Sequence, residues 1–229
     1  MRGEWLRAFG FFFVVAFLGL VAYAVLPKLL GVASGPEGEI LTLIKSEESK
    51  GLQFPIPGRS SPLRSTTAYF DRITITVAPD GKSAEAVATL DFNGVLHETR
   101  VSSLGYEKLR FVRTGFSWEV LGSYAPRLSR IVKALEARRM GLESGDLARL
   151  NIPTDASVPE ELAQLLALGD RRYEARAWYI RTDRDEVLVT EDATLKGKSP
   201  DRPIHEERTR RLSLRPTASG EFFFPQGLL

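Results

Sequence analysis

The chain has 229 residues, 43% of them hydrophobic and 26% charged, which is the composition of a folded protein with one large or two small domains. Lysine and arginine number 31 against 29 aspartates and glutamates, and this near-neutrality argues against a dedicated nucleic-acid binder. The absence of cysteine excludes a disulfide scaffold, Cys-ligated zinc, iron–sulfur clusters and thiol catalysis.

The first strong signal along the chain is the apolar run AFGFFFVVAFLGLVAYAVL at residues 8–26, which holds no charged or amide side chain. As a helix it spans about 28 Å, close to the hydrocarbon thickness of a bilayer. We predict a cytoplasmic tail at 1–7 and a transmembrane helix at 8–27. The run exceeds the usual apolar core of a signal peptide, which favours an uncleaved anchor, although the small residues at 32–34 leave cleavage open. Three small residues could permit close helix packing: Ala16, Gly19 and Ala22.

The charges that flank this run predict its orientation. Arg2 and Arg7 precede it, whereas Lys28 is followed by Glu37 and Glu39. The positive-inside rule then puts the N-terminus in the cytoplasm and the rest of the chain outside it, in the periplasm of a Gram-negative cell. We therefore expect a protein of the bacterial inner membrane; because the charges are few, the reversed topology stays open.

Residues 28–67 have a mixed composition. The segment 39–50 is typical of a juxtamembrane helix. The following segment, 51–65, contains three prolines and three serines, which predicts an extended linker or surface loop.

Strand patterns begin at Ala68 and define a first unit at 68–121. Segments 69–77 and 84–92 alternate in hydrophobicity and flank an Asp-Gly turn, which predicts a hairpin. Two further strand-like stretches complete an expected four-stranded antiparallel meander.

A second unit at 122–229 starts with helical patterns at 125–150 and 158–169. Four strand-like segments follow: 171–182, 186–197, 203–216 and 220–229. The predicted fold class is α+β, with two antiparallel-sheet units and helices packed between them. The charged runs at 137–139 and 206–215 are interpreted as solvated faces.

The two sheet units align with each other. Residues 68–92 match 173–197 at an offset of 105 without a gap, which predicts an internal duplication. At an offset of 108, His97 meets His205, and these are the only histidines. We interpret them as equivalent positions of two sheets and not as one catalytic pair. A shared metal site stays open if the units face each other, but it needs a third ligand.

Phosphate-binding glycine loops, nucleophile elbows and zinc-protease motifs are absent from the sequence. We therefore predict no catalytic residue, no metal site and no cofactor. The C-terminal EFFFPQGLL is unusually apolar, and it is either a last strand that buries alternate side chains or a docking tail. Its possible interaction residues are Phe222, Phe223, Phe224, Leu228 and Leu229.

A family resemblance rests on residues 125–229. The helix that ends in LEARRMGLESGDLARL at 135–150, followed by a short helix and a long antiparallel sheet, resembles the nuclear transport factor two-like domains. The resemblance implies a cone-shaped α+β fold. The first unit departs from the pattern, because its helices are shortened to 39–50 and the proline-rich stretch. With a single-pass anchor, such domains are similar to the scaffold subunits of type IV secretion and conjugation machines, which implies a non-enzymatic role.

Two functions remain in competition. An envelope scaffold would contact other membrane or envelope proteins, or further copies of itself, and its sheet concavity would be filled by its own side chains. A membrane-tethered ligand-binding protein or enzyme would instead keep an open pocket in the C-terminal domain. Candidate residues for that pocket are Tyr173, Asp192 and His205. The lack of a concentrated catalytic motif favours the scaffold.

Overall fold

The computed structural model of the chain describes residues 35–56, 62–146, 149–150, 158, 160–184 and 186–224. The predicted transmembrane helix at 8–27, with the packing residues Ala16, Gly19 and Ala22, lies outside these residues. Within the described part of the chain, no helix is both long and apolar enough to cross a membrane.

The described chain is an α+β protein, as predicted. The first group of elements is α2 (Pro36–Lys50), β1 (Gln53–Phe54), β2 (Leu63–Val77), β3 (Ser83–Leu96), β4 (Thr99–Thr114) and β5 (Ser117–Val120). The second group is α3 (Pro126–Ser144), α4 (Glu160–Leu166), β6 (Gly169–Thr182), β7 (Val187–Lys198), β8 (Pro203–Pro216) and β9 (Phe222–Phe223).

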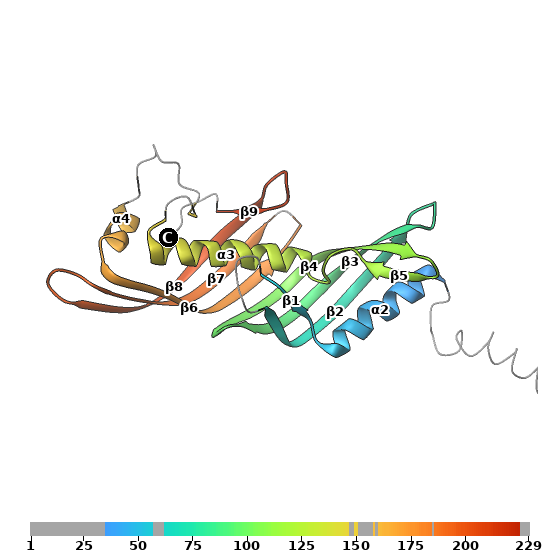
Figure 1. Cartoon of the computed structure of the whole chain (residues 1–229), viewed down its shortest axis with the longest axis horizontal. Helices are drawn as coiled ribbons and strands as arrows, with labels where there is room; N and C mark the ends of the chain where they lie inside the picture. Colours follow the sequence, from blue (N-terminus) through green and yellow to red (C-terminus); the bar gives the residue numbers. More distant parts are fainter. Residues whose placement is uncertain are drawn as a thin grey trace, which may run out of the picture.

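A single sheet of nine strands, in the order β1-β2-β3-β4-β6-β7-β8-β9 with β5 on β4, joins the two groups. All pairings are antiparallel except that of β4 with β6, where Arg100–Gly105 lie beside Ala177–Thr182. Each group is thus an antiparallel meander, and one parallel pairing fuses the two meanders (Figure 1).

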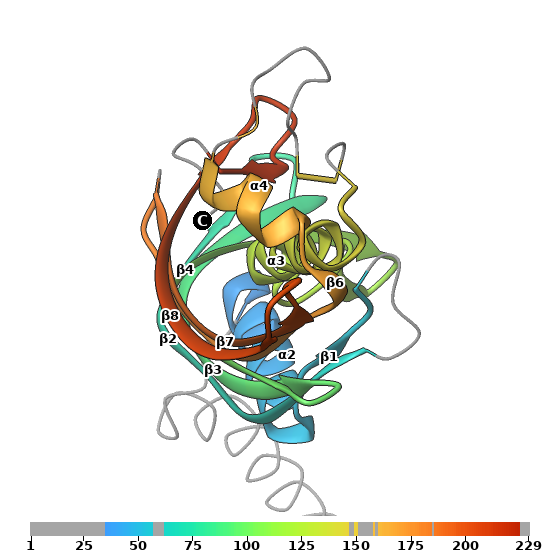
Figure 2. The same cartoon turned by 90° about the vertical axis from the view of Figure 1, so that its left-hand side faces the viewer.

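The sheet curls around its helices. Figure 2, an end-on view, shows α2 and α3 inside the curve. The central helix α3 contacts β4, β6 and β9, whereas α2 packs on β2. Because side chains alternate between the two faces of a strand, each long strand has one face turned toward the helices and one turned outward. We call these the concave and the convex face.

Apolar spacing accounts for the position of α3. Leu128, Ile131, Val132 and Leu135 recur at helical intervals, and all are buried in the main core. Leu142, two turns further on, belongs to a second cluster with residues of α4, β6 and β7. One helix therefore packs against both halves of the sheet.

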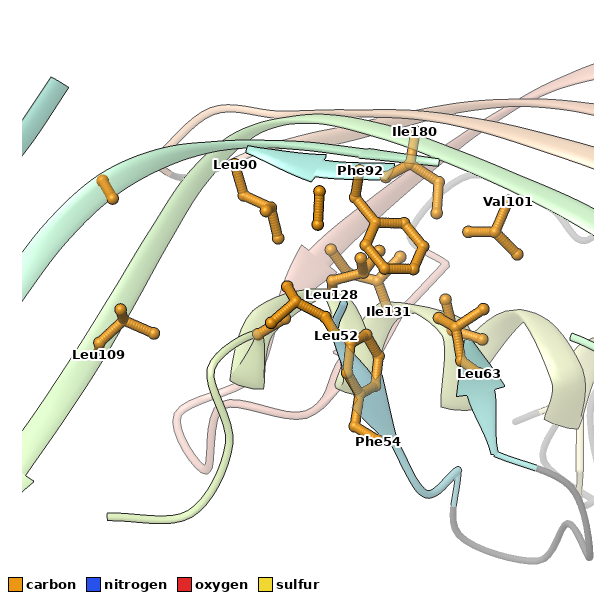
Figure 3. Packing of buried hydrophobic residues seen from close by; sticks show 14 of the residues in the cluster. Leu52, Phe54, Leu63, Leu90, Phe92, Val101, Leu109, Leu128, Ile131 and Ile180 are labelled. Carbon is orange, nitrogen blue, oxygen red and sulfur yellow. The ribbon is translucent and has the colours of Figure 1, made fainter. Parts of the chain in front are cut away.

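The proline-rich segment expected to be a linker contributes to the core where the structure describes it. Leu52, Phe54, Ile56 and Leu63 are each at most 4% exposed. Figure 3 shows three of these side chains packed with residues of α3 and β3. Burying a side chain of this size is worth about 1.5–3 kcal/mol, which offsets the ordering of a segment rich in turn-forming residues.

The order of elements repeats in outline. In each half a helix precedes three long strands and a final short strand, although β1 occurs only in the first half and α4 only in the second. The strands β2 and β6 end at Val77 and Thr182, which matches the offset of 105 in the sequence. The proposed equivalence of the histidines is wrong, however. His97 lies in the two-residue turn between β3 and β4, with φ of 53°, whereas His205 lies within β8 opposite Lys196. The turn between β3 and β4 is shorter than the turn between β7 and β8. A shared His-Glu dipeptide therefore need not occupy the same position in the two strand pairings.

Candidate functional site

The concave interior of the second half holds a polar network around Glu191 of β7. Arg138 of α3 donates to Oε2 of Glu191 at 2.7 Å, and the Tyr173 hydroxyl donates to the same oxygen at 2.7 Å. The indole of Trp178 donates to Oε1 at 3.0 Å. All four residues are at most 1% exposed. The carboxylate thus has three donors from two elements, α3 and β6, and this part of the interior is occupied by the chain's own side chains.

Burial and neighbouring charges both shift the pKa values of this network. Burial, and after it the charge of Glu191, raises the pKa of the Tyr173 hydroxyl to about 12, against the opposing effect of Arg138. Burial alone would lower the pKa of Arg138, but the attraction of Glu191 and Tyr173 outweighs it and the net direction is upward. The guanidinium also lies 5.7 Å from the Tyr173 ring centroid and 5.9 Å from that of Phe224. Such an arrangement holds its protons and suits a structural role.

The three predicted pocket residues do not converge. Tyr173 lies on the concave face, opposite Leu195 in the sheet register. Asp192 is on the convex face, where its carboxylate accepts from the hydroxyl of Thr209 at 2.8 Å. His205 pairs with Lys196 in the register, which also places it on the convex face. The residues that we predicted to line one pocket therefore lie on opposite faces of the sheet.

A second buried carboxylate joins the sheet to the start of α3. The Glu107 carboxylate of β4 accepts from the backbone N–H of Arg127 at 3.0 Å and of Leu128 at 2.7 Å. It acts as the N-terminal cap that the helix lacks locally, because Ala125 has no capping side chain. Burial raises the pKa of Glu107 to about 7, against the opposing effects of these two N–H groups and of Arg127 and Arg130.

Arg127 connects the same helix start to the second half. Its guanidinium donates to the carbonyl oxygens of Asp183 and Arg184 in the β6–β7 turn. It also lies 5.5 Å from the ring centroid of Tyr106 and 5.7 Å from that of Phe222. Together with Glu107, this side chain ties both halves of the sheet to one helix end.

The convex face carries a groove where the halves meet. Exposed apolar side chains from three strands gather there: Leu104 is 47% exposed, Tyr179 47% and Leu188 51%. The groove has a volume of about 470 Å³, and Arg181 and Arg211 also line it. We call it the joint groove. Apolar side chains at such exposure on adjacent strands are typical of a contact surface.

A second depression, at the β3–β4 turn, is polar. It is lined by His97, Glu98, Glu136, Arg139 and Glu174, among others. Two of these carboxylates are already paired: Arg139 lies 3.1 Å from Glu136, and Lys196 lies 2.9 Å from Glu174. In the described residues, no group of three potential ligands could hold a metal ion.

The C-terminal phenylalanines pack inward where the structure describes them. Phe222 is 8% exposed and belongs to the main core, and Phe224 packs against both clusters. Phe223 is half-buried in β9. The two leucines of the expected docking tail, Leu228 and Leu229, lie outside the described residues.

The described chain is thus an α+β protein whose curved sheet encloses a central helix and a core of buried side chains. No family model matches the chain, and no curated protein matches it. Among solved structures, it is similar to a candidate ketosteroid isomerase from Shewanella frigidimarina, at 13% identity and a TM-score of 0.36. The match covers 43% of this chain and 93% of that protein. A similarity at this level assigns neither activity nor substrate.

The interpretation of the charged run 137–139 as a solvated face is wrong for Arg138, which is 1% exposed, although the sequence contained a signal for its burial. Arg138 continues the apolar stripe of Leu128, Ile131 and Leu135, so helical spacing puts it on the buried face. Glu191 stands on the buried face of β7, between Val189 and Ala193 of the same face. A charge on each of two buried faces indicates a buried ion pair.

Proposed function

We propose that the protein is a single-pass membrane-anchored, extracytoplasmic scaffold or interaction subunit of a bacterial envelope complex, acting by protein contacts and not by catalysis. The anchor is the apolar run at 8–26. The observation that carries the proposal is a contrast between the two faces of the sheet. The concave face of the second half is filled by the Glu191 network, whereas the convex face carries the joint groove.

The joint groove favours a particular kind of partner. Leu104, Tyr179 and Leu188 present apolar surface, while Arg181 and Arg211 add positive charge at its border. A segment with an apolar side chain and a nearby carboxylate complements this chemistry. We infer that such a segment of another envelope protein, or of a second copy of the chain, binds there.

The proposal extends to the domain organisation. Residues 68–121 and 122–229 are taken as duplicated units, and the second unit as a nuclear transport factor two-like domain. The repeated order of elements supports the duplication. The long helix, short helix and curved sheet of the second half support the family assignment.

The competing function, a ligand-binding protein or enzyme that uses an interior cavity, has less support. A ligand in the concave face would have to displace Tyr173 or Trp178 from Glu191, and this would leave a buried carboxylate without donors.

Purification of the full-length chain from its native membranes in mild detergent tests the proposal. We expect a defined set of membrane or envelope proteins at fixed ratios, identified by mass spectrometry. A chain that is recovered alone and monomeric at every detergent concentration tried would remove the basis for a scaffold role.

A further inference from the structure

The start of the described chain and two hairpin turns lie at one end of the molecule. The C-terminal end of α2 lies at the start of β2, because the Ser65 N–H donates to the Leu52 carbonyl oxygen at 2.8 Å. Lys45 donates to the carbonyl oxygen of Phe70, in mid-strand, at 2.7 Å. The helix therefore runs antiparallel to β2, and its first residue, Pro36, lies toward the β2–β3 turn (Figure 1).

The β4–β5 turn lies at the same end. In the sheet register, Val77 is paired with Ala84, Ala84 with Phe111, and Phe111 with Val120. The β4–β5 strands continue past this line to a tight turn, and β5 also contacts α2. We call this region, with its two turns and the start of α2, the entry end.

The entry end exposes apolar side chains. Phe116, at the tip of the β4–β5 turn, is 96% exposed; Leu121 is 64% and Val112 38% exposed. Val112 and Leu121 line one apolar groove with Ala78 and Ala84. Gly115, with φ of 65°, supplies the left-handed residue that a two-residue turn requires, and the turn projects Phe116 outward.

Basic side chains accompany this apolar surface. The Arg113 N–H donates to the Lys82 carbonyl oxygen at 2.9 Å, so the two basic residues are neighbours beside the turns. Arg113 also lies 5.9 Å from the ring centroid of Trp118. Carboxylates also lie at this end: Asp80 shares the β2–β3 turn and accepts from the Lys82 N–H, and Glu37 and Glu39 are exposed in the first turn of α2. Aromatic and basic side chains together suit the boundary between lipid headgroups and acyl chains.

The short length of chain between the predicted anchor and the described residues favours a lipid surface as the partner of this end. The apolar run predicted to span the membrane ends at Leu26 and Pro27, and the described chain starts at Gly35. Even fully extended, the eight residues from Lys28 to Gly35 reach at most about 28 Å, so the entry end stays near the bilayer.

We propose that the entry end rests on the lipid surface, with Phe116 inserted at the boundary of the acyl chains and Lys82 and Arg113 at the headgroups. This inference rests on the proposed anchor and adds a second, peripheral membrane contact. That contact orients the sheet, so that its far end points away from the bilayer.

Because the natural chain has no cysteine, single labels can be placed cleanly. The full-length Phe116→Cys variant carries a nitroxide and is reconstituted into liposomes that contain anionic lipid. The matched control is Asp201→Cys, an exposed site in the β7–β8 turn. This turn lies at the opposite end, because β6 runs parallel to β4 and β7 returns in the other direction. We expect the label at 116 to collide more with oxygen than with a water-soluble nickel chelate, and the label at 201 to show the reverse ratio.

Carbonate extraction of the same liposomes separates the two levels of the proposal. Extraction of the chain would refute the anchor and this inference with it. If the chain stays integrated but position 116 is as open to the chelate as position 201, the anchor stands and the lipid contact is refuted. Shielding of position 116 from both reagents would indicate a protein contact and would also overturn the inference.

Discussion

Glu191 stabilises the second half as a carboxylate that is withdrawn from water and held by three donors. Arg138, Tyr173 and Trp178 reach it from α3 and β6, so one side chain connects the helix to the sheet. A buried ion pair adds little net stability relative to an apolar replacement of both partners. Removing one partner is costly, because the other charge stays buried.

The substitution Glu191→Gln should therefore destabilise the chain strongly. It keeps the shape of the side chain but removes the negative charge that lies 2.7 Å from the Arg138 guanidinium, and Arg138 is only 1% exposed. We expect a loss of about 3–5 kcal/mol in the free energy of unfolding. Denaturation of the full-length chain in detergent, followed by tryptophan fluorescence, measures it.

Glu174→Gln is the matched control, because this glutamate pairs with Lys196 at the surface, with side chains 47% and 42% exposed. Breaking such a pair costs about 0–1 kcal/mol. Equal losses in the two variants would contradict a structural role for the Glu191 network.

Glu107 should make stability depend on pH in the opposite direction from most paired carboxylates. Its pKa is raised from 4.5 to about 7 by burial, so the folded chain holds the proton more tightly than the unfolded chain. The contribution is fully present below pH 4.5 and is lost as the pH rises through 7. The full range is on the order of 3 kcal/mol.

The substitution Glu107→Gln tests this dependence, since glutamine is neutral throughout. The stability of the variant, measured from pH 4 to pH 8, should lack the fall that this residue contributes to the natural chain. Glu174→Gln should retain it. A curve of unchanged slope in Glu107→Gln would assign the dependence to other groups.

At the scale of elements, the pairing of β4 with β6 decides the architecture, because it turns two meanders into one sheet. The close approach depends on Gly105, whose φ is 150°: a Cβ there would overlap the carbonyl oxygen and the hydroxyl of Thr182. Gly105 and Thr182 are register partners at the end of the parallel ladder. Only glycine lets the two backbones meet here.

We expect Gly105→Ala to open this end of the ladder. Overpacking and the unfavourable φ together should cost about 2–4 kcal/mol. Gly81→Ala is the control, because its φ of 65° is also unfavourable but nothing lies within 4 Å of the added Cβ. Hydrogen exchange should rise at residues 177–182 in Gly105→Ala and stay unchanged in Gly81→Ala. Equal protection of β6 in both variants would refute the role of Gly105.

The elements themselves were largely predictable from local pattern. The strand predicted at 203–216 coincides with β8, and the helix at 39–50 lies within α2. Two failures have physical reasons. His97 and Glu98 form a turn without glycine, and a non-glycine residue at positive φ leaves no signal in the sequence. The segment 51–65 reads as polar and irregular, yet its few apolar residues are core residues once the sheet curls over them.

At the scale of the whole molecule, the sequence pattern could not predict which residues meet. Tyr173, Asp192 and His205 lie on the neighbouring strands β6, β7 and β8. Tyr173 is on the concave face and the other two are on the convex face, so the thickness of the sheet separates them. The joint groove, in turn, combines Leu104 of β4 with Tyr179 and Leu188, which are more than 70 positions further on. Both the separation of the predicted pocket residues and the assembly of the joint groove depend on long-range strand order, which local periodicity does not encode.

The central claim, that the chain binds envelope proteins through the joint groove, is tested most directly by Leu188→Asp. The substitution puts a carboxylate among exposed apolar side chains without touching the core, so the chain should fold and reach the membrane normally. Tyr69→Asp is the control, since Tyr69 is 57% exposed on β2 and lies outside the groove. Quantitative mass spectrometry of full-length chains purified in mild detergent should show the partner set retained by Tyr69→Asp and lost by Leu188→Asp. Retention of the same partners at the same ratios by Leu188→Asp would contradict the claim.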